Sequence, residues 1–536
     1  MAAAHPDVAA VRVPVGEKGE TILYDERSFA LLEKETRRTA ALLDACGIRQ
    51  GTRTLVMVRP GLDLIRLVFA FFMTGAVPVV IDPGMGLRSF LQCVRRTRPE
   101  ALVGIPLAQI ISHVFRPSFR SVRTRLSITG RFPRRLEGFG EGQGARLLRA
   151  GETAAILFTS GSTGAPKGVV YTHGMFDAQV RLIGKRFEIQ PGEVDLPMLP
   201  IFALFNPAFG MTTVVPKMNP SRPATVDPLH IVRAIQQNGV TNSFGSPVLW
   251  EKISRYAEAN SIQLPTVRRV LMAGAAVPPA LMERFRRIIP NGEVFSPYGA
   301  TEALPVAAIS AAEVLGETRS QTEAGAGSCV GVPLREIDIR VVALREPPEN
   351  RLEDTVELPA GEVGELLVCG PVVTETYDSL PEASRAAKLT DQTGRVWHRM
   401  GDLVYLDANG RIWFCGRKAE RVEAHGTVFY PDRCEAIFNA HPRVFRTALI
   451  AWGDASKEGE EALQPALAVE PEREAFPKSS AARAEFAAEL RALAEAHPHT
   501  RAIQKYFFVR RFPVDVRHNA KIHRLTLAKR LAHVTP

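Results

Sequence analysis

Short β-branched segments alternate with longer segments of helical periodicity through the first half of the chain. Apolar residues recur at helical spacing over residues 28–45 and 62–73, and the apolar runs 54–58 and 77–81 indicate short buried strands. Parallel strands need a crossover connection, usually a helix, so this alternation predicts parallel βαβ units. The pattern continues at residues 102–105, 154–158, 229–237 and 267–272. The predicted fold class is therefore α/β.

A different pattern begins near residue 362. Residues 362–370 and 403–414 contain short strands with Asn409-Gly410 at the position of a hairpin turn, so the sheet there is predicted to be antiparallel. After Gly416 a strand at 449–451, a helix at 481–496 and a strand at 506–509 are enough for a small α+β domain. The 536 residues exceed the roughly 250 to 300 at which a single core stops growing. We expect two domains, residues 1–416 and 417–536.

Composition is that of a soluble globular protein. Hydrophobic residues make up 46% and charged residues 23%, and the most apolar stretch falls short of the about 20 apolar residues of a transmembrane segment. The N-terminus lacks the features of a signal peptide, and the six cysteines form no C-x-x-C pair. We expect a cytoplasmic protein with no transmembrane segment. The net charge of +10 does not by itself identify a partner, and we expect no nucleic-acid partner.

The segment Thr159-Ser-Gly-Ser-Thr-Gly-Ala-Pro-Lys-Gly168 follows the predicted strand 154–158 directly. Hydroxyl side chains, glycines and one lysine in a single loop suit a polyphosphate, because backbone N–H groups can approach the phosphates closely and the lysine adds a cation. The loop is not a Walker loop, since Pro166 and Gly168 break that pattern. The alternative, a Ser/Gly-rich surface turn, is less favoured because such turns seldom follow a buried strand in this order.

This loop resembles the signature loop of the adenylate-forming superfamily, which includes acyl-CoA synthetases, luciferases and peptide adenylation domains. Five further segments follow in that superfamily's order: 273–276 (AGAA), 298–302 (YGATE), 400–403 (MGDL), 416–418 (GRK) and Lys521 in NAKIHR. The resemblance covers nearly the whole chain. It implies a large N-terminal α/β domain and a small, mobile C-terminal α+β domain that carries Lys521.

The resemblance also implies an ATP site with Mg²⁺. Lys167, Glu302 and Lys521 would be catalytic, with Glu302 and Thr301 at the metal and Lys521 at the carboxylate and α-phosphate. The remaining nucleotide-binding residues would be Thr159, Ser160, Gly161, Ser162, Thr163 and Gly164 at the phosphates, Gly274, Ala275, Tyr298 and Gly299 at the adenine, and Asp402 with Arg417 at the ribose. Taken singly, Asp402 also fits a turn, Arg417 a surface ion pair and Glu302 a helix N-terminus. Their joint occurrence favours the nucleotide site.

A closer resemblance connects the chain to the β-lactone synthetases of bacterial long-chain olefin biosynthesis, through segments 81–86, 201–205 and 315–332. It implies that a 2-alkyl-3-hydroxy fatty acid is activated as an acyl-adenylate and that its own hydroxyl then attacks the carbonyl, giving a β-lactone, AMP and pyrophosphate. Ala203 stands where acyl-CoA synthetases usually have histidine. An internal nucleophile needs no second substrate, only a reactive geometry.

Large apolar clefts would be needed for two alkyl chains, and Phe202, Ala203, Phe205 and Phe244 are candidates to line them. For any single aromatic, an ordinary core position is the alternative. The sequence does not identify the base that would deprotonate the hydroxyl. Alternative functions are an acyl-CoA ligase, a fatty-acyl-AMP ligase and a degenerate nucleotide-binding scaffold. The resemblance suggests assembly with a β-lactone decarboxylase and a reductase.

Overall fold

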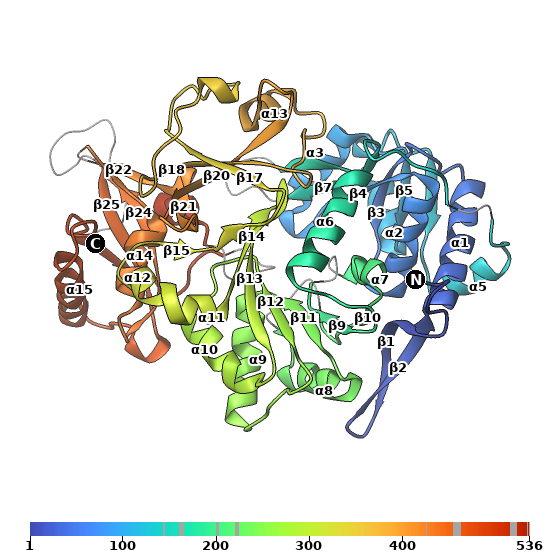
Figure 1. Ribbon diagram of the computed structural model, residues 1–536, viewed down its shortest axis with the longest axis horizontal. Coiled ribbons are helices and arrows are strands. Elements are labelled where there is room, and N and C mark those ends of the chain that lie inside the picture. Colours follow the sequence, from blue (N-terminus) through green and yellow to red (C-terminus); the bar gives the residue numbers. More distant parts are fainter. Residues whose placement is uncertain are drawn as a thin grey trace.

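The computed structural model describes residues 1–142, 145–159, 166–199, 203–219, 225–424, 426–453, 463–514, 522–532 and 534. Figure 1 shows the N-terminal half with its helices on one side of the molecule and the C-terminal segment, coloured orange to red, on the other. Strands β13 (Glu293–Ala300) and β14 (Ala303–Ser310) lie between them. Among the described residues, no helix is long and apolar enough to cross a membrane.

The first sheet has the order β6-β5-β3-β4-β7-β8. Its first five strands are parallel, while β8 runs antiparallel to β7. The strands are β3 (Arg53–Met57), β4 (Val77–Val80), β5 (Ala101–Gly104), β6 (Thr124–Ser127), β7 (Thr153–Thr159) and β8 (Lys167–Thr172). The helices of this part are α1 (Phe29–Ala45), α2 (Leu62–Thr74), α3 (Leu87–Thr97), α4 (Pro106–Val114), α5 (Phe132–Glu137) and α6 (His173–Arg186).

Local sequence explains the helix ends in this part. The Ser28 side chain accepts a hydrogen bond from the backbone N–H of Leu31 and so caps α1. Helix α2 ends at Gly75, whose φ of 72° is a left-handed conformation that glycine adopts without strain. The two helices predicted at 28–45 and 62–73 are therefore confirmed as α1 and α2.

The second sheet has nine strands in the order β16-β14-β13-β12-β11-β9-β10-β1-β2. Its central strands are parallel, and the hairpins β1–β2 and β13–β14 are antiparallel. The strands are β1 (Ala9–Lys18), β2 (Thr21–Ser28), β9 (Val194–Pro197), β10 (Thr212–Val214), β11 (Asn242–Gly245), β12 (Arg269–Met272), β13 (Glu293–Ala300), β14 (Ala303–Ser310) and β16 (Val332–Pro333). The helices are α7 (Asn206–Phe209), α8 (Pro228–Asn238), α9 (Pro247–Ala259), α10 (Pro279–Ile288), α11 (Ala311–Glu313) and α12 (Arg319–Glu323).

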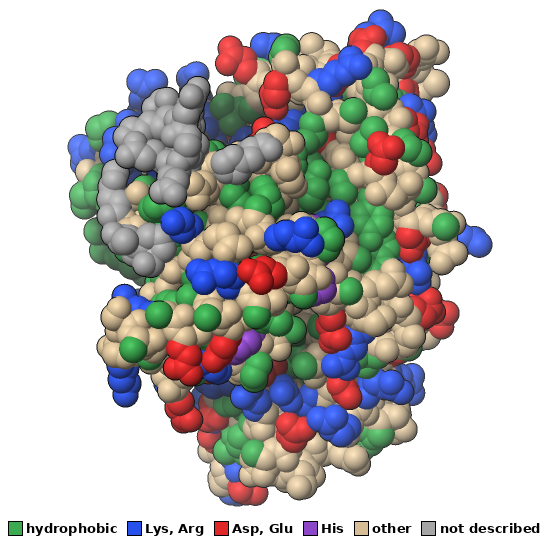
Figure 2. All heavy atoms as spheres, turned by 90° about the vertical axis from the view of Figure 1, so that its left-hand side faces the viewer, with side chains coloured by type: hydrophobic (Ala, Val, Ile, Leu, Met, Phe, Trp, Pro, Cys, Tyr) green, Lys and Arg blue, Asp and Glu red, His purple; other side chains and the backbone are tan. Residues whose placement is uncertain are grey.

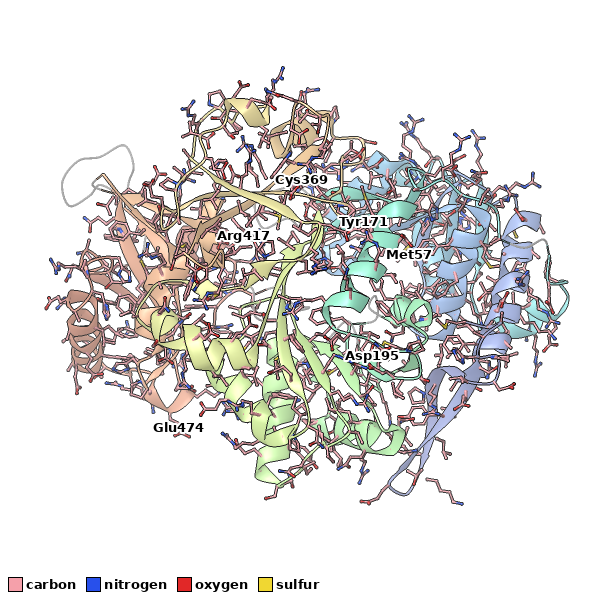
Figure 3. All side chains as sticks on the ribbon, viewed as in Figure 1. Met57, Tyr171, Asp195, Cys369, Arg417 and Glu474 are labelled. Atoms are coloured by element: carbon pink, nitrogen blue, oxygen red, sulfur yellow. The ribbon has the colours of Figure 1, made fainter. Side chains whose placement is uncertain are left out.

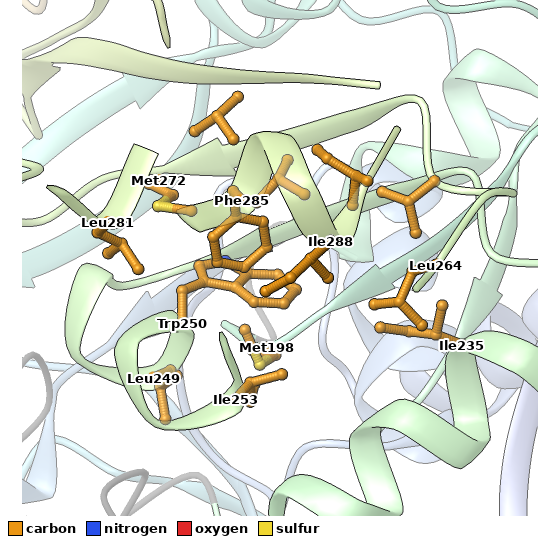
Figure 4. Packing of buried hydrophobic residues seen from close by; sticks show 14 of the residues in the cluster. Met198, Ile235, Leu249, Trp250, Ile253, Leu264, Met272, Leu281, Phe285 and Ile288 are labelled. Atoms are coloured by element: carbon orange, nitrogen blue, oxygen red, sulfur yellow. The ribbon is translucent and has the colours of Figure 1, made fainter. Parts of the chain in front are cut away.

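The core beneath this sheet is built around Trp250 on α9 and Phe285 on α10. Their rings meet edge to face with centroids 5.2 Å apart, and both side chains are 1% exposed. Figure 4 shows aliphatic side chains and Met198 and Met272 surrounding the pair. Edge-to-face aromatic packing of this kind adds about 0.5–1.5 kcal/mol beyond area burial. The core thereby anchors the strands whose ends carry the candidate site.

A third sheet is antiparallel, as the sequence predicted, with the order β15-β21-β20-β18-β17 and with β19 paired to β20. Its strands are β15 (Ser328–Cys329), β17 (Asp338–Val342), β18 (Gly364–Cys369), β19 (Lys388–Thr390), β20 (Val396–Leu406) and β21 (Ile412–Arg417), and α13 (Pro381–Ala387) precedes β19. The hairpin β20–β21 turns at Asn409 and Gly410, the latter with φ of 73°. Glycine suits this position because tight hairpin turns need a residue with positive φ.

The C-terminal segment forms its own sheets, β22–β23 and β24–β25–β26. The elements are β22 (Val422–Ala424), β23 (Thr427–Phe429), α14 (Pro431–Asn439), β24 (Val444–Trp452), β25 (Gln464–Pro471), α15 (Ser480–Glu495), β26 (Lys505–Phe508) and α16 (Arg524–Leu531). Figure 2 shows basic and acidic side chains interspersed on the face at this end of the molecule. The boundary at 416/417 stays a prediction.

The sequence left open how the N-terminal strands are divided among sheets. They form two sheets, with an antiparallel pair at one edge of the first sheet and antiparallel pairs at both edges of the second. The hairpin β13–β14 is one of these antiparallel pairs, because only Thr301 and Glu302 connect its strands. A two-residue connection cannot make the crossover that a parallel pair needs.

Candidate active site

Predicted site residues from distant parts of the chain meet at the carboxyl ends of strands. Gly274 and Ala275 follow β12, Thr301 and Glu302 follow β13, and Thr159 ends β7. In open α/β sheets ligands bind outside the carboxyl ends of the strands. Because β12 and β13 are parallel neighbours, Gly274, Ala275, Thr301 and Glu302 lie at the same edge of the nine-stranded sheet. Arg417 and Tyr171 both lie in the central part of the molecule (Figure 3).

Several predicted residues lie outside the described residues: Ser160, Gly161, Ser162, Thr163, Gly164, Phe202 and Lys521. Strands β7 and β8, which lie before and after the residues 160–164, are described. Thr159 is the register partner of Lys167 in the antiparallel pair β7–β8. The predicted phosphate loop therefore connects two neighbouring strands, and its lysine is the first residue of β8.

Tyr298 and Arg417, both partly exposed, form a polar cluster with the buried Asp402. The Tyr298 hydroxyl donates to one carboxylate oxygen of Asp402, and Arg417 Nη1 lies 2.7 Å from the other. Strands β20 and β21 pair Asp402 with Arg417 directly, which brings the two side chains together. Burial raises the pKa of Tyr298 and the neighbouring Asp402 carboxylate raises it further, so the phenol stays a donor. The cluster offers a fixed carboxylate of the kind that accepts hydrogen bonds from ribose hydroxyls.

Two glycines of the predicted adenine site are required by the backbone. Gly274 has φ of 97°, a region that side chains other than glycine rarely adopt. A Cβ at Gly299 would lie 2.6 Å from the carbonyl oxygen of Ala303, so a larger residue does not fit there. Gly274 thus allows a left-handed backbone conformation after β12, and Gly299 allows the close approach of the chain next to Tyr298.

Glu302 is held in the tight turn between β13 and β14, and not at a helix N-terminus. The Tyr377 hydroxyl donates to Glu302 Oε1 at 2.8 Å, and Thr374 donates from its backbone N–H to the Glu302 carbonyl at 2.9 Å. The Tyr171 hydroxyl donates to the Thr301 carbonyl. Burial raises the pKa of both tyrosines, with Glu302 the next cause, so neither competes with Glu302 as an anion.

Glu302 is the residue that decides whether the site fits Mg²⁺. The described residues contain no group of three or more His, Cys, Asp or Glu side chains that would hold a metal by themselves. Mg²⁺ is usually bound through one or two carboxylates together with substrate phosphates and waters. Glu302 has a second carboxylate oxygen besides the one that accepts from Tyr377, and so fits a metal shared with ATP.

Two lysines approach the ring of Tyr377. Lys167 Nζ lies 4.7 Å and Lys388 Nζ 5.9 Å from the ring centroid. Because Tyr377 also binds Glu302, this ring connects two of the residues predicted to be catalytic. Sequence reasoning missed both Tyr377 and Lys388, which lie in no motif that we singled out.

His398 is a further residue that the sequence did not reveal. It pairs with Lys388 across strands β19 and β20, and its Nδ1 lies 3.1 Å from the carbonyl oxygen of Ala387. Burial lowers the pKa of His398 well below its usual range, and the cations Lys388, Lys167 and Arg417 lower it further. The imidazole is therefore neutral and donates through Nδ1. Its position two residues before Met400 in the segment that ends in Asp402 was the available signal.

A small apolar cavity of about 70 Å³ lies beside the predicted acyl pocket. Its lining includes Leu64, Ile65, Met198, Ala203, Leu204 and Met218. Phe244 belongs to the same region, since its carbonyl accepts from the Met198 backbone N–H at 2.7 Å. Phe205 lies 6.5 Å from the ring of Phe176, which stacks on Tyr171. The rings of Phe205, Phe176 and Tyr171 thus form a series of contacts that ends at the turn carrying Glu302.

Arg524, three residues after Lys521, binds two buried glutamates of the predicted C-terminal domain. Arg524 donates to Glu435 Oε1 at 2.7 Å and to Oε2 at 2.6 Å, and its Nη1 donates to Glu420 Oε2 at 3.0 Å. Glu420 and Glu435 are 7% and 5% exposed. A partly exposed arginine paired with two buried carboxylates fixes the start of α16 relative to residues 418–420.

Comparison with known proteins identifies the family. A family model described as "AMP-binding enzyme" matches residues 2–378. The chain belongs to the family of AMP-binding enzymes. Olefin beta-lactone synthetases from Xanthomonas campestris pv. campestris and Stenotrophomonas maltophilia match this AMP-binding enzyme at 44% and 43% identity. Both alignments cover 98% of the chain, with 95% and 96% of the respective relatives.

More distant relatives share the fold. A long-chain-fatty-acid–CoA ligase from Thermus thermophilus is 26% identical over 79% of this AMP-binding enzyme and 77% of its own length. Among solved structures, ATP-bound MatB from Rhodopseudomonas palustris has a TM-score of 0.79 at 20% identity, covering 98% of this chain and 96% of its own. O-Succinylbenzoate coenzyme A synthetase from Bacillus subtilis, in complex with AMP, has a TM-score of 0.76 at 20% identity and the same coverage. The predicted α/β adenylate-forming fold is confirmed.

Proposed function

We propose that this AMP-binding enzyme is an ATP-dependent β-lactone synthetase. The observation that carries the proposal is 44% identity with an olefin beta-lactone synthetase over 98% of the chain. Its substrate would be a 2-alkyl-3-hydroxy fatty acid, and its products a β-lactone, AMP and pyrophosphate. The apolar residues that line the small cavity beside Ala203 suit an alkyl chain, because such a chain must be held mainly by apolar contacts.

In the first step the substrate carboxylate attacks the α-phosphorus of ATP and pyrophosphate leaves. Asp402 and Arg417 would hold the ribose, and Lys167, with residues of the loop that begins at Thr159, would hold the phosphates. Lys521 would approach the carboxylate and α-phosphate. Positive groups around the transferring phosphorus lower the barrier by neutralising the developing charge. Mg²⁺ at Glu302 would neutralise further charge on the phosphates.

In the second step the 3-hydroxyl attacks the acyl carbonyl, the bond to AMP breaks, and the hydroxyl proton is released. No second substrate is bound, so the enzyme's task is to hold the hydroxyl and carbonyl close together. A histidine that serves thioester formation is not needed for this step. Buried Ala203 at that position is consistent with intramolecular capture.

The decisive experiment is incubation of the purified protein with ATP, Mg²⁺ and a racemic 2-alkyl-3-hydroxy fatty acid, without coenzyme A. NMR should detect a β-lactone together with AMP. Formation of acyl-adenylate without lactone would contradict the proposal.

An acyl-CoA ligase or a fatty-acyl-AMP ligase is the second candidate, favoured by 26% identity with the Thermus thermophilus fatty-acid–CoA ligase. Its signature would be ATP consumption that depends strictly on coenzyme A or a holo carrier protein. The same reaction mixture, with either acceptor added, separates the two functions.

We further propose that the protein works in the cytoplasm with a β-lactone decarboxylase and a reductase. All six cysteines are free thiols, as expected for a reducing compartment. A complex of these enzymes would pass the reactive β-lactone directly to the decarboxylase that consumes it. Purification from native cell extract without either partner would count against this assembly.

A further inference from the structure

Lys388 is a cation at the candidate site that no motif explains. It begins β19 and is only partly exposed. Its ammonium group donates to the backbone carbonyl of Thr374 and lies 3.3 Å from Thr374 Oγ1. An ammonium has three N–H donors. The contacts to Thr374 orient the lysine without using its whole donor capacity.

The neighbours of Lys388 are those predicted for the polyphosphate. Thr374 also binds the backbone carbonyl of Glu302, through its N–H at 2.9 Å and its hydroxyl at 3.1 Å. Tyr377 contacts Lys167, Lys388 and the Glu302 carboxylate. Lys388 is therefore attached to the same small framework as the predicted phosphate lysine and the predicted metal ligand.

The charges of this framework are not balanced within the described residues. Among the described residues, the Lys388 ammonium contacts Thr374 and the Tyr377 ring, and Lys167 contacts the same ring. Nearby acidic groups are Glu302, which accepts from Tyr377, and Glu375, which is exposed and so screened by solvent. The other titratable neighbours, Tyr377 and His398, are neutral. Two lysines facing one ring repel each other unless an anion lies between or beside them.

We propose that Lys388 binds the pyrophosphate part of ATP together with Lys167. As the α-phosphorus–oxygen bond breaks, its electron pair passes to the bridging oxygen, which leaves as part of pyrophosphate. Two ammonium groups beside that leaving group stabilise the charge it gains. Lys388 thus serves the first step of the proposed function. The inference depends on that function only for the identity of the acid that is activated.

Protonation supports this assignment. Burial lowers the pKa of Lys388 to about 7, Glu302 and Glu375 raise it, and Lys167 lowers it further. A polyphosphate anion brought beside this amine favours its charged form. Binding of ATP or pyrophosphate near neutral pH should therefore be accompanied by proton uptake.

The test compares ligand affinities of Lys388→Met, Lys388→Arg and wild-type protein by isothermal titration calorimetry in the presence of Mg²⁺. The probes are ATP, inorganic pyrophosphate and AMP, and none of them requires the acyl substrate. Lys388→Met should weaken ATP and pyrophosphate binding at least tenfold and leave AMP binding unchanged, because AMP lacks the pyrophosphate part. Lys388→Arg should recover most of the affinity, since it restores the cation.

Lys185→Met is the matched control, because Lys185 is an exposed lysine at the far end of α6. It should leave all three affinities unchanged. Equal weakening of AMP and ATP by Lys388→Met would overturn the inference, as would unchanged binding of both. If Lys388→Met does not fold, Lys388→Gln replaces it in the same comparison.

A second measurement separates the two chemical steps. Chemically prepared acyl-adenylate needs no pyrophosphate site, so Lys388→Met should convert it to lactone at the wild-type rate. Loss of that conversion with unchanged ATP binding would assign Lys388 to the second step and refute the pyrophosphate role. If wild-type protein makes no lactone at all, the proposed function fails while the calorimetric result for Lys388 still stands.

Discussion

Replacing Asp402 with asparagine tests the nucleoside part of the candidate site. The carboxylate is 1% exposed, accepts from the Tyr298 hydroxyl and lies 2.7 Å from Arg417 Nη1. Asparagine has almost the same size but offers one NH₂ group in place of an acceptor oxygen. One of the two partners, Tyr298 or Arg417, therefore faces a donor in the variant.

The expected magnitude follows from the lost interaction. Hydrogen bonds to charged groups contribute about 1.5–3 kcal/mol each. A loss of one such bond to the bound ribose corresponds to a rise in the KM for ATP of about 10- to 150-fold, since about 1.4 kcal/mol is a factor of ten. The maximal rate should change less, because the ribose does not take part in bond breaking.

The assay is substrate-dependent exchange of labelled pyrophosphate into ATP, measured over a range of ATP concentrations. Asp407→Asn is the matched control, because Asp407 also pairs with an arginine on the hairpin β20–β21, Arg411 at 2.7 Å, but at its turn. Asp407→Asn should leave the KM for ATP unchanged. Equal KM values for Asp402→Asn and wild type would refute the ribose assignment.

Three further changes have defined outcomes. Burial raises the pKa of Asp195 to about 7 from 3.8, so between these values the native state keeps a proton that the unfolded chain releases. The free energy of unfolding should therefore fall as pH rises from about 4 to 7. Asp195→Asn should remove this contribution in urea unfolding, and an unchanged pH dependence would contradict the reasoning. Arg524→Met leaves the buried Glu420 and Glu435 without their arginine partner, which should lower the free energy of unfolding by about 3–5 kcal/mol. Limited proteolysis should then cleave the C-terminal segment at a lower urea concentration, and an unchanged cleavage midpoint would contradict this role of Arg524. Glu302→Gln keeps an acceptor for Tyr377 but lowers the charge, so half-maximal adenylation should need at least tenfold more Mg²⁺, and an unaltered Mg²⁺ requirement would remove Glu302 as a ligand.

The sequence revealed those parts of the site that lie in contiguous motifs. Tyr298, Glu302 and Asp402 belong to short segments whose residue types follow from nucleotide chemistry and family resemblance, and the structure brings Tyr298 and Asp402 into contact. The strand alternation likewise predicted α1, α2 and the parallel strands β3 and β4. Local periodicity is a strong signal where elements are long and half-buried.

Tyr377, Lys388 and His398 could not be predicted in this way. They reach the site through strand pairing and through a loop that folds back onto Glu302, so their neighbours are distant in sequence. The division of the strands into two sheets could not be predicted for a similar reason. Sheet membership depends on pairing between distant segments, which periodicity within one segment does not encode.

The two-residue turn at Thr301 and Glu302 has a thermodynamic consequence. Its ends are held by the hairpin β13–β14, and its carbonyl groups accept from Tyr171 and Thr374. The conformational entropy of fixing this turn is therefore lost when the protein folds, and little remains to be lost when a nucleotide arrives. A ligand that binds Glu302 meets a carboxylate already in place, so more of the interaction free energy appears as affinity.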